Sequence, residues 1–201
     1  MEKIIDYIVS QYDPECLILY GSYADGSFNA NSDLDAFVLG NVKESVHDTS
    51  VVEGVQLDVF VYPVGSQMNP EDFPQLYHSK ICIDRQGRGK TLQDAVTAYL
   101  DQYPAKSIEA IQQDLIWCEK MLARTQRGDA EGYYRWHWVL CDSLEFYCNI
   151  RGWFYFGPKK TLLLMQRHDP VAYALYSNAL KHMEYAYLAY WVDFLKRELC
   201  S

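Results

Sequence analysis

The residues of this chain best suited to phosphate chemistry are a glycine–serine pair and three aspartates downstream of it. Gly21-Ser22 follow an apolar run, and Asp33 and Asp35 lead into a second apolar run. Glycine lets backbone N–H groups approach an anion closely, and paired carboxylates can hold a divalent cation. The third acid, Asp58, lies in another apolar run, where a charge without a partner is costly to bury. Together these residues predict a metal–nucleotide site.

Strands are needed to bring these side chains together. Residues 16–20, 34–39, 55–62 and 80–84 are short and mostly apolar, and turn-forming residues bound them, so we expect four strands of one sheet. Since side chains alternate between the faces of a strand, the first two aspartates should project to one side. The polar segment 40–54, which carries His47, is expected to be irregular.

The expected site suits nucleotidyl transfer. Asp33, Asp35 and Asp58 can bind two Mg²⁺ ions about 3.5–4 Å apart. Mg²⁺ keeps substrate phosphates among its ligands, so a nucleoside triphosphate is the expected co-substrate. In-line attack of a hydroxyl on the α-phosphate would then release pyrophosphate.

These motifs resemble a known family. Gly21-Ser22, ten further residues, Asp33-Leu34-Asp35 and then Asp58 on the next apolar strand look like the nucleotidyltransferase superfamily typified by DNA polymerase beta. Size, acidity and a trailing helical half are most similar to its small bacterial antibiotic members, the aminoglycoside and lincosamide nucleotidyltransferases. The resemblance implies that Gly21 and Ser22 bind the nucleotide, and that the three aspartates are catalytic metal ligands.

One position departs from that pattern. Many small members carry Arg or Lys where this chain has Asp25, so the turn itself lacks the positive charge that a triphosphate needs. Lys159 and Lys160, at the expected start of a helix, are candidates to supply this charge, and so is Arg151. The alternative is that both lysines are merely exposed.

We expect an α+β fold in two domains. Residues 1–104 should form a small mixed sheet with flanking helices, the last of them running from Leu92, capped by Thr91, to Tyr103. Residues 105–201 show an almost wholly helical pattern, which predicts an all-α bundle forming the wall of an acceptor and nucleotide cleft.

Within this helical half, residues 130–150 place several polar and aromatic side chains on one helix face. Glu145 or Asp142 could act there as a general base or bind the acceptor; the alternative is a solvated helix face. Nearby aromatic residues would either stack on a base or acceptor or belong to the core, namely Trp136, Trp138, Trp153, Tyr155 and Phe156.

The composition narrows the choice of partners. The net charge of -9 disfavours a long nucleic acid. The six cysteines form no C-x-x-C pair, and Cys16, Cys82, Cys118 and Cys141 have apolar neighbours, so we expect buried free thiols. The N-terminus lacks the pattern of a signal peptide, and no apolar run reaches membrane-spanning length, which favours the cytoplasm.

The leading hypothesis is a Mg²⁺-dependent enzyme that transfers a nucleoside monophosphate, most simply AMP from ATP, to a hydroxyl of a small molecule. An antibiotic is one candidate acceptor, and a homodimer could complete the site. Two alternatives stay open: an antitoxin-type protein adenylyltransferase and a catalytically inactive nucleotide-binding module. No Arg is followed by His at the R-x(4–6)-H spacing of the toxin partners of such antitoxins, which argues against a fused toxin half.

Overall fold

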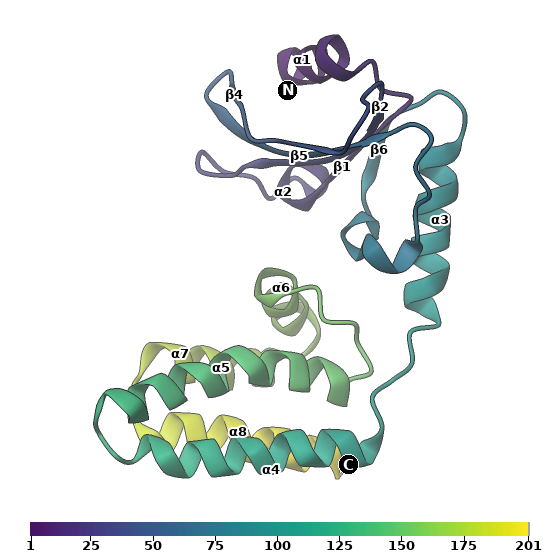
Figure 1. The fold of residues 1–201 in the computed structure, drawn as a ribbon. Coiled ribbons are helices and arrows are strands. Elements are labelled where there is room, and N and C mark those ends of the chain that lie inside the picture. The colour runs from purple at the N-terminus through teal and green to yellow at the C-terminus, as the bar shows by residue number, and fades with distance from the viewer. Residues whose placement is uncertain (201) are drawn as a thin grey trace. The chain divides into compact units, whose positions relative to one another are not determined.

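The structure, a computed structural model, describes residues 1–200 and divides into two compact units, Met1–Gln102 and Tyr103–Ser201. The first unit contains every strand (Figure 1). Its elements are α1 (Glu2–Tyr12), β1 (Cys16–Tyr20), α2 (Gly21–Asp25), β2 (Leu34–Gly40), β3 (Val46–Asp48), β4 (Val51–Val52), β5 (Val55–Pro63), the 3-10 helices η1 (Pro70–Asp72) and η2 (Pro74–Leu76), β6 (Lys80–Asp84) and α3 (Arg88–Asp101).

The sheet is mixed. Its strand order is β3-β5-β2-β1-β6, and β4 also pairs with β5. β2 and β5 run parallel, whereas the other neighbouring pairs are antiparallel. This arrangement places the C-terminal end of β1 beside the N-terminal end of β2, which in turn lies beside Asp58 of β5.

The two faces of this sheet differ in what covers them. On one face, Ile4 and Ile8 of α1 join a buried apolar cluster with Leu17, Leu19, Leu34, Ala36, Val38, Leu57, Val59 and Val61. α2 lies on the other side of the sheet from α1 (Figure 1). Along β5, Asp58, Phe60 and Tyr62 alternate with the buried residues and are only half-buried. The acidic residues therefore stand on the face opposite α1.

The segment 40–54 is not irregular, as its polar composition led us to expect. It contains β3 and β4, which both pair with β5. Asp48 anchors β3, because its buried carboxylate accepts hydrogen bonds from the Tyr12 hydroxyl (2.8 Å) and the Ser50 backbone N–H (2.9 Å). The edge of β5 thus recruits a strand that local propensity does not favour.

The last helix of this unit, α3, begins at Arg88 rather than at Leu92, so Thr91 is not its cap. The Asp84 carboxylate accepts the backbone N–H groups of Gly89 (3.0 Å) and Lys90 (2.8 Å). These are orphan N–H groups of a first helical turn. A residue at the end of β6 therefore caps the helix, which lets it start earlier.

The second unit is entirely helical among its described residues. Its helices are α4 (Ile108–Thr125), α5 (Ala130–Ile150), α6 (Pro158–His168), α7 (Pro170–Lys181) and α8 (Tyr185–Leu199). Tyr147 and Trp191 are fully buried at its centre, and Trp136 is also buried. Trp138, Trp153 and Tyr155 pack against this core while remaining partly exposed. The predicted fold class, a mixed-sheet α+β unit followed by an all-α bundle, is confirmed.

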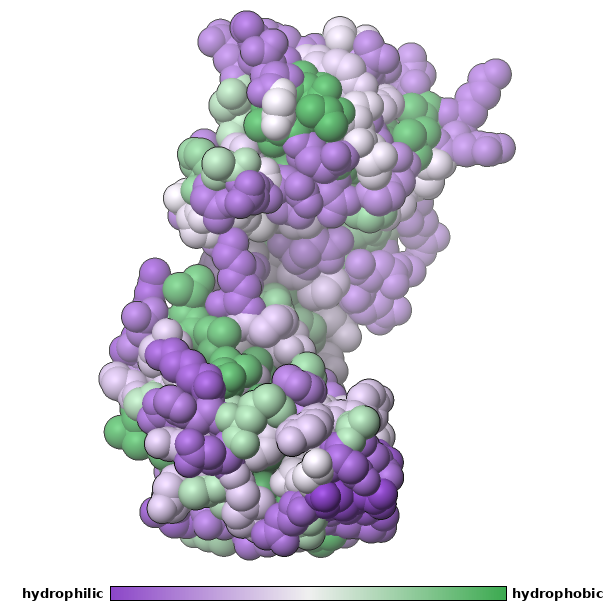
Figure 2. Space-filling view, turned by 90° about the vertical axis from the view of Figure 1, so that its left-hand side faces the viewer, coloured by the Kyte–Doolittle hydropathy of each residue, from purple (hydrophilic) through white to green (hydrophobic). Residues whose placement is uncertain are grey.

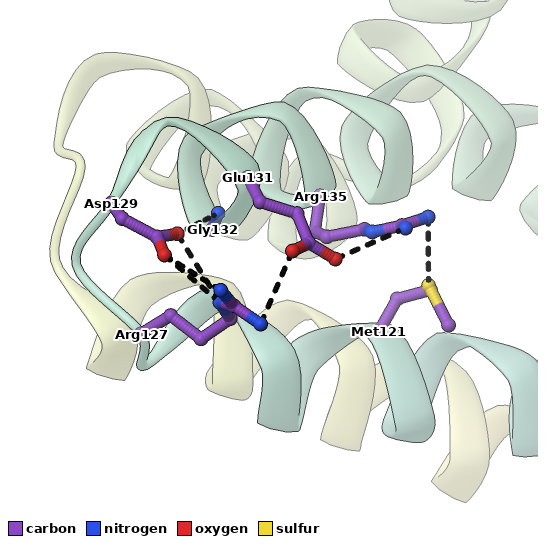
Figure 3. A network of polar contacts seen from close by, with 6 residues as sticks. All are labelled: Met121, Arg127, Asp129, Glu131, Gly132 and Arg135. Atoms are coloured by element: carbon purple, nitrogen blue, oxygen red, sulfur yellow. Dashed lines mark hydrogen bonds and ion pairs between the residues drawn. The ribbon is translucent and has the colours of Figure 1, made fainter.

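A polar network fixes the connection between α4 and α5 (Figure 3). Asp129 caps α5 by accepting the Gly132 N–H (2.9 Å), and it also pairs with Arg127 (2.8 Å). Glu131 lies between Arg127 (3.1 Å) and Arg135 (3.3 Å). These contacts stabilise the connecting turn and the first turns of α5, and the Arg135 guanidinium also lies 3.9 Å from Met121 Sδ of α4, so the network has a structural role.

On the face seen in Figure 2, hydrophilic residues predominate and hydrophobic residues form small groups among them. Among residues 1–200, none of the helices has both the length and the apolar content that a membrane crossing requires. All six cysteines are free. Cys141 is exposed and Cys82 is half-buried, so the expectation of burial holds for Cys16 and Cys118 but is wrong for these two.

Candidate functional site

The glycine–serine turn lies in contact with one of the predicted aspartates. Gly21 follows β1 directly and opens α2 with φ +64°, a left-handed conformation that favours glycine. A Cβ added to Gly21 would lie 2.2 Å from Asp35 Oδ2 and 2.9 Å from Asp35 Cγ. The Asp35 carboxylate is thus seated against the turn, and the absent side chain of Gly21 makes room for it.

Asp35 and Asp58 are direct neighbours on adjacent strands. The parallel register pairs Asp35 of β2 with Asp58 of β5, and the antiparallel register pairs Tyr20 of β1 with Asp35. Residues paired in this way project to the same face of a sheet. Asp33 lies immediately before β2 and is exposed. The structure therefore brings Gly21, Asp35 and Asp58 to one face and leaves Asp33 at its border.

His47 is a member of this site that the sequence analysis missed. Its Nε2 lies 2.6 Å from Asp58 Oδ1. Its ring also stacks on Phe60, with 4.2 Å between the centroids and 6° between the planes. The pairing of β3 with β5 places His47 directly opposite Phe60. The sequence signal, Val46-His47-Asp48, is too short and too polar to identify a strand.

The negative charge of this face affects the pKa of Tyr20. Burial raises the pKa of its phenol well above the ordinary value, and the charges of Asp58 and Asp35 raise it further. Tyr20 therefore stays a neutral phenol beside two carboxylates. A cation bound near these carboxylates would offset this accumulation of negative potential.

The donor set suits a magnesium ion. Mg²⁺ takes oxygen ligands and is commonly held by one or two carboxylates together with substrate phosphates. The adjacent carboxylates of Asp35 and Asp58 provide such a pair. Within residues 1–200 the protein alone gathers no three His, Cys, Asp or Glu side chains into a ready metal site. Asp33 or the substrate phosphates would therefore have to supply the remaining ligands of a bound cation.

The remaining residues of the turn have structural contacts. Ser22 is buried, with 6% of its surface exposed. Asp25, which stands where the resembling family often has a cation, accepts the Ser27 backbone N–H at 2.9 Å and so shapes the loop after α2. The turn thus brings backbone groups and no positive charge.

The other predicted residues lie in the second unit. Both lysines lie in the first turn of α6. Lys159 is exposed, and the Lys160 ammonium lies 5.0 Å from the centroid of the Phe156 ring. Arg151 is committed elsewhere, because its guanidinium pairs with Asp169 (2.5 Å) and Glu198 (2.8 Å). Arg151 is therefore a structural residue of the bundle.

Asp142 and Glu145 lie on α5, where Glu145 is exposed and Asp142 is half-buried. Burial raises the pKa of Asp142, against the lowering effect of a hydrogen bond with the Trp138 side chain. A carboxyl group with a raised pKa accepts a proton more readily, which suits a general base.

Comparison with known proteins gives a family match and similar solved structures. Residues 2–62 match the family described as "Polymerase beta, Nucleotidyltransferase". Among solved structures, the chain is similar to a nucleotidyltransferase-like protein from Exiguobacterium sibiricum 255-15, with 14% identity, a TM-score of 0.41, and coverage of 97% of this chain and 71% of that one. No significant match is found among curated proteins.

Proposed function

Because residues 2–62 match the polymerase beta nucleotidyltransferase family, we propose that this protein moves AMP from ATP to a hydroxyl of a small-molecule acceptor and releases pyrophosphate. The observation that carries this proposal is the pairing of Asp35 with Asp58, together with the close approach of Asp35 to Gly21. It joins a turn able to bind phosphate to carboxylates able to hold a cation.

Each predicted site residue of the first unit has a role in this proposal. The backbone around Gly21 and Ser22 binds the triphosphate, since N–H groups near a glycine can approach phosphate oxygens. Asp33, Asp35 and Asp58 hold Mg²⁺, with two ions as the expected number. When bound, Mg²⁺ supplies charge neutralisation at the phosphates and lowers the pKa of a bound hydroxyl.

For the general base, the candidate residues are Asp142 and Glu145. Asp142, whose pKa is raised by burial, or Glu145 would take the proton of the acceptor hydroxyl. Lys159 and Lys160 are the candidate cations of the second unit for phosphate binding. The net charge of -9 favours a small acceptor, such as an antibiotic, over a polynucleotide. Six free cysteines fit a reducing compartment such as the cytoplasm.

The test is an acceptor screen with Mg²⁺ and ATP in which pyrophosphate release and the mass of the product are both measured. Aminoglycosides, lincosamides and simple polyols form the panel, and each nucleoside triphosphate is compared with ATP. We expect pyrophosphate only with an acceptor, together with a product heavier by one nucleoside monophosphate. Light scattering of the same sample tests the expected homodimer.

Two variants make the screen specific to this site. Asp35→Ala should abolish pyrophosphate release, because it removes the carboxylate that touches the turn. Asp6→Ala removes an exposed carboxylate from α1 and should leave the rate unchanged. Pyrophosphate release that survives Asp35→Ala would disprove the assignment. Transfer of label from ATP to a protein instead of a small molecule would favour the adenylyltransferase alternative.

A further inference from the structure

His47 makes a close contact with Asp58 although both side chains are partly exposed. The side chains of His47 and Asp58 are 47% and 39% exposed, so their pairing adds little to stability. Yet the two groups approach to 2.6 Å, and the imidazole lies flat on Phe60. The contact contributes little to folding, but it involves a proposed metal ligand. We therefore look for its role in function.

The position of His47 is determined from both sides of the sheet. On the α1 side, the buried carboxylate of Asp48 accepts the Tyr12 hydroxyl and the Ser50 N–H, which fixes the register of β3. Because neighbouring side chains of a strand alternate, His47 must then project to the opposite face, where Asp58 lies. Stacking on Phe60 limits the rotation of the ring.

The direction of this hydrogen bond follows from the chemistry of the two groups. A carboxylate accepts hydrogen bonds, so the 2.6 Å contact requires the tautomer of His47 that carries a proton on Nε2. The donor occupies Oδ1 of Asp58 and leaves Oδ2 available. Without the donor, the Asp58 side chain would be free to adopt other rotamers.

We propose that His47 is a positioning residue that holds the Asp58 carboxylate in its cation-binding orientation through the Nε2–Oδ1 hydrogen bond. This proposal rests on the proposed function, because it needs Asp58 to bind a divalent cation. It assigns a task to the segment 40–54, namely to carry a hydrogen-bond donor to the site. Partners of metal ligands of this kind typically change metal affinity by about 10–100-fold when they are removed.

The test measures Mn²⁺ binding by electron paramagnetic resonance in the presence of α,β-methylene-ATP, so that no turnover is needed. His47→Phe keeps a ring to stack on Phe60 but removes the donor, and we expect about tenfold weaker Mn²⁺ binding. His47→Gln returns an N–H donor and should recover part of the affinity. His78→Ala removes another exposed histidine of the same unit and should change nothing. Equal Mn²⁺ affinity of His47→Phe and the wild type would overturn the proposal.

The wild-type arm separates this proposal from the proposed function. If the wild type and Asp35→Ala both fail to bind Mn²⁺, the metal site itself is wrong, and the role of His47 falls with it. A metal-free measurement tests the hydrogen bond directly: the imidazole ¹⁵N signals of His47 should shift in Asp58→Ala and stay in place in Asp6→Ala. Unchanged signals in Asp58→Ala would refute the contact.

Discussion

Replacing Gly21 with alanine places a methyl group where the Asp35 carboxylate now lies. The new Cβ would be 2.2 Å from Asp35 Oδ2, whereas an ordinary contact begins near 3.4 Å. The carboxylate would have to move by about 1.2 Å, and a misplacement of about 1 Å at a reacting centre costs about 100-fold in rate. The left-handed backbone at φ +64° adds a cost of about 1–2 kcal/mol to folding.

A matched control separates these two effects. Gly26 has a similar backbone conformation, with φ +79°, but a Cβ added there meets nothing within 4 Å. Gly26→Ala should therefore lose about 1–2 kcal/mol of unfolding free energy, like Gly21→Ala, but keep its activity. In the contacts of the added methyl group, the variants differ by the collision with Asp35.

The assay has two parts. Pyrophosphate release with Mg²⁺ and ATP gives the rate, and urea unfolding gives the stability. Unfolding must be followed by far-UV circular dichroism, because all five tryptophans lie in the second unit and fluorescence would not report the first. We expect Gly21→Ala to be about 100-fold slower than Gly26→Ala at equal stability. Equal rates in the two variants would refute the reasoning.

Three further predictions follow from the same structure. Chelation of divalent cations should abolish pyrophosphate release without changing the circular dichroism spectrum, because the proposed cation ligands are half-buried or exposed carboxylates outside the core; added Mg²⁺ should restore the rate. Burial opposes ionisation of Asp48, but hydrogen bonds with Ser50 and Tyr12 prevail and lower its pKa. Its contribution to stability should thus be present above about pH 4 and lost as the pH falls through the lowered pKa, so Asp48→Asn should weaken urea resistance at pH 7 more than at pH 3. In the native protein at pH 8, a thiol reagent should modify the exposed Cys141 and Cys200, as read by mass spectrometry. Buried Cys16 and Cys118 should react only on unfolding, because burial raises the pKa of each thiol to about 12.

Some features of the site could be predicted from the sequence, and others could not. The spacing of Asp33 and Asp35 and the alternation around Asp58 could be read directly, because strand side chains repeat with period two. The positions of Lys159 and Lys160 in a first helical turn were equally readable, since Gly157-Pro158 is a typical helix start. What each of these lysines binds remains a prediction.

Other features depended on partners far away in the chain. Arg151 looked like a spare cation, but Asp169 and Glu198 hold it in the bundle. The start of α3 was placed too late, because its cap comes from Asp84 of the preceding strand and not from Thr91. Cys141 has apolar neighbours in sequence but lies on the exposed side of α5.

By itself, the sequence determined the α+β plan, the strands that carry Asp35 and Asp58, and the reaction class that a glycine–serine turn with three aspartates suggests. These are local properties, governed by hydrophobic periodicity and residue chemistry. Only the tertiary structure placed Asp35 against Gly21 and aligned it with Asp58 in a parallel register. It alone brought His47 to Asp58, because β3 forms only where the edge of β5 is open to pair with it, and that edge is a property of the assembled sheet.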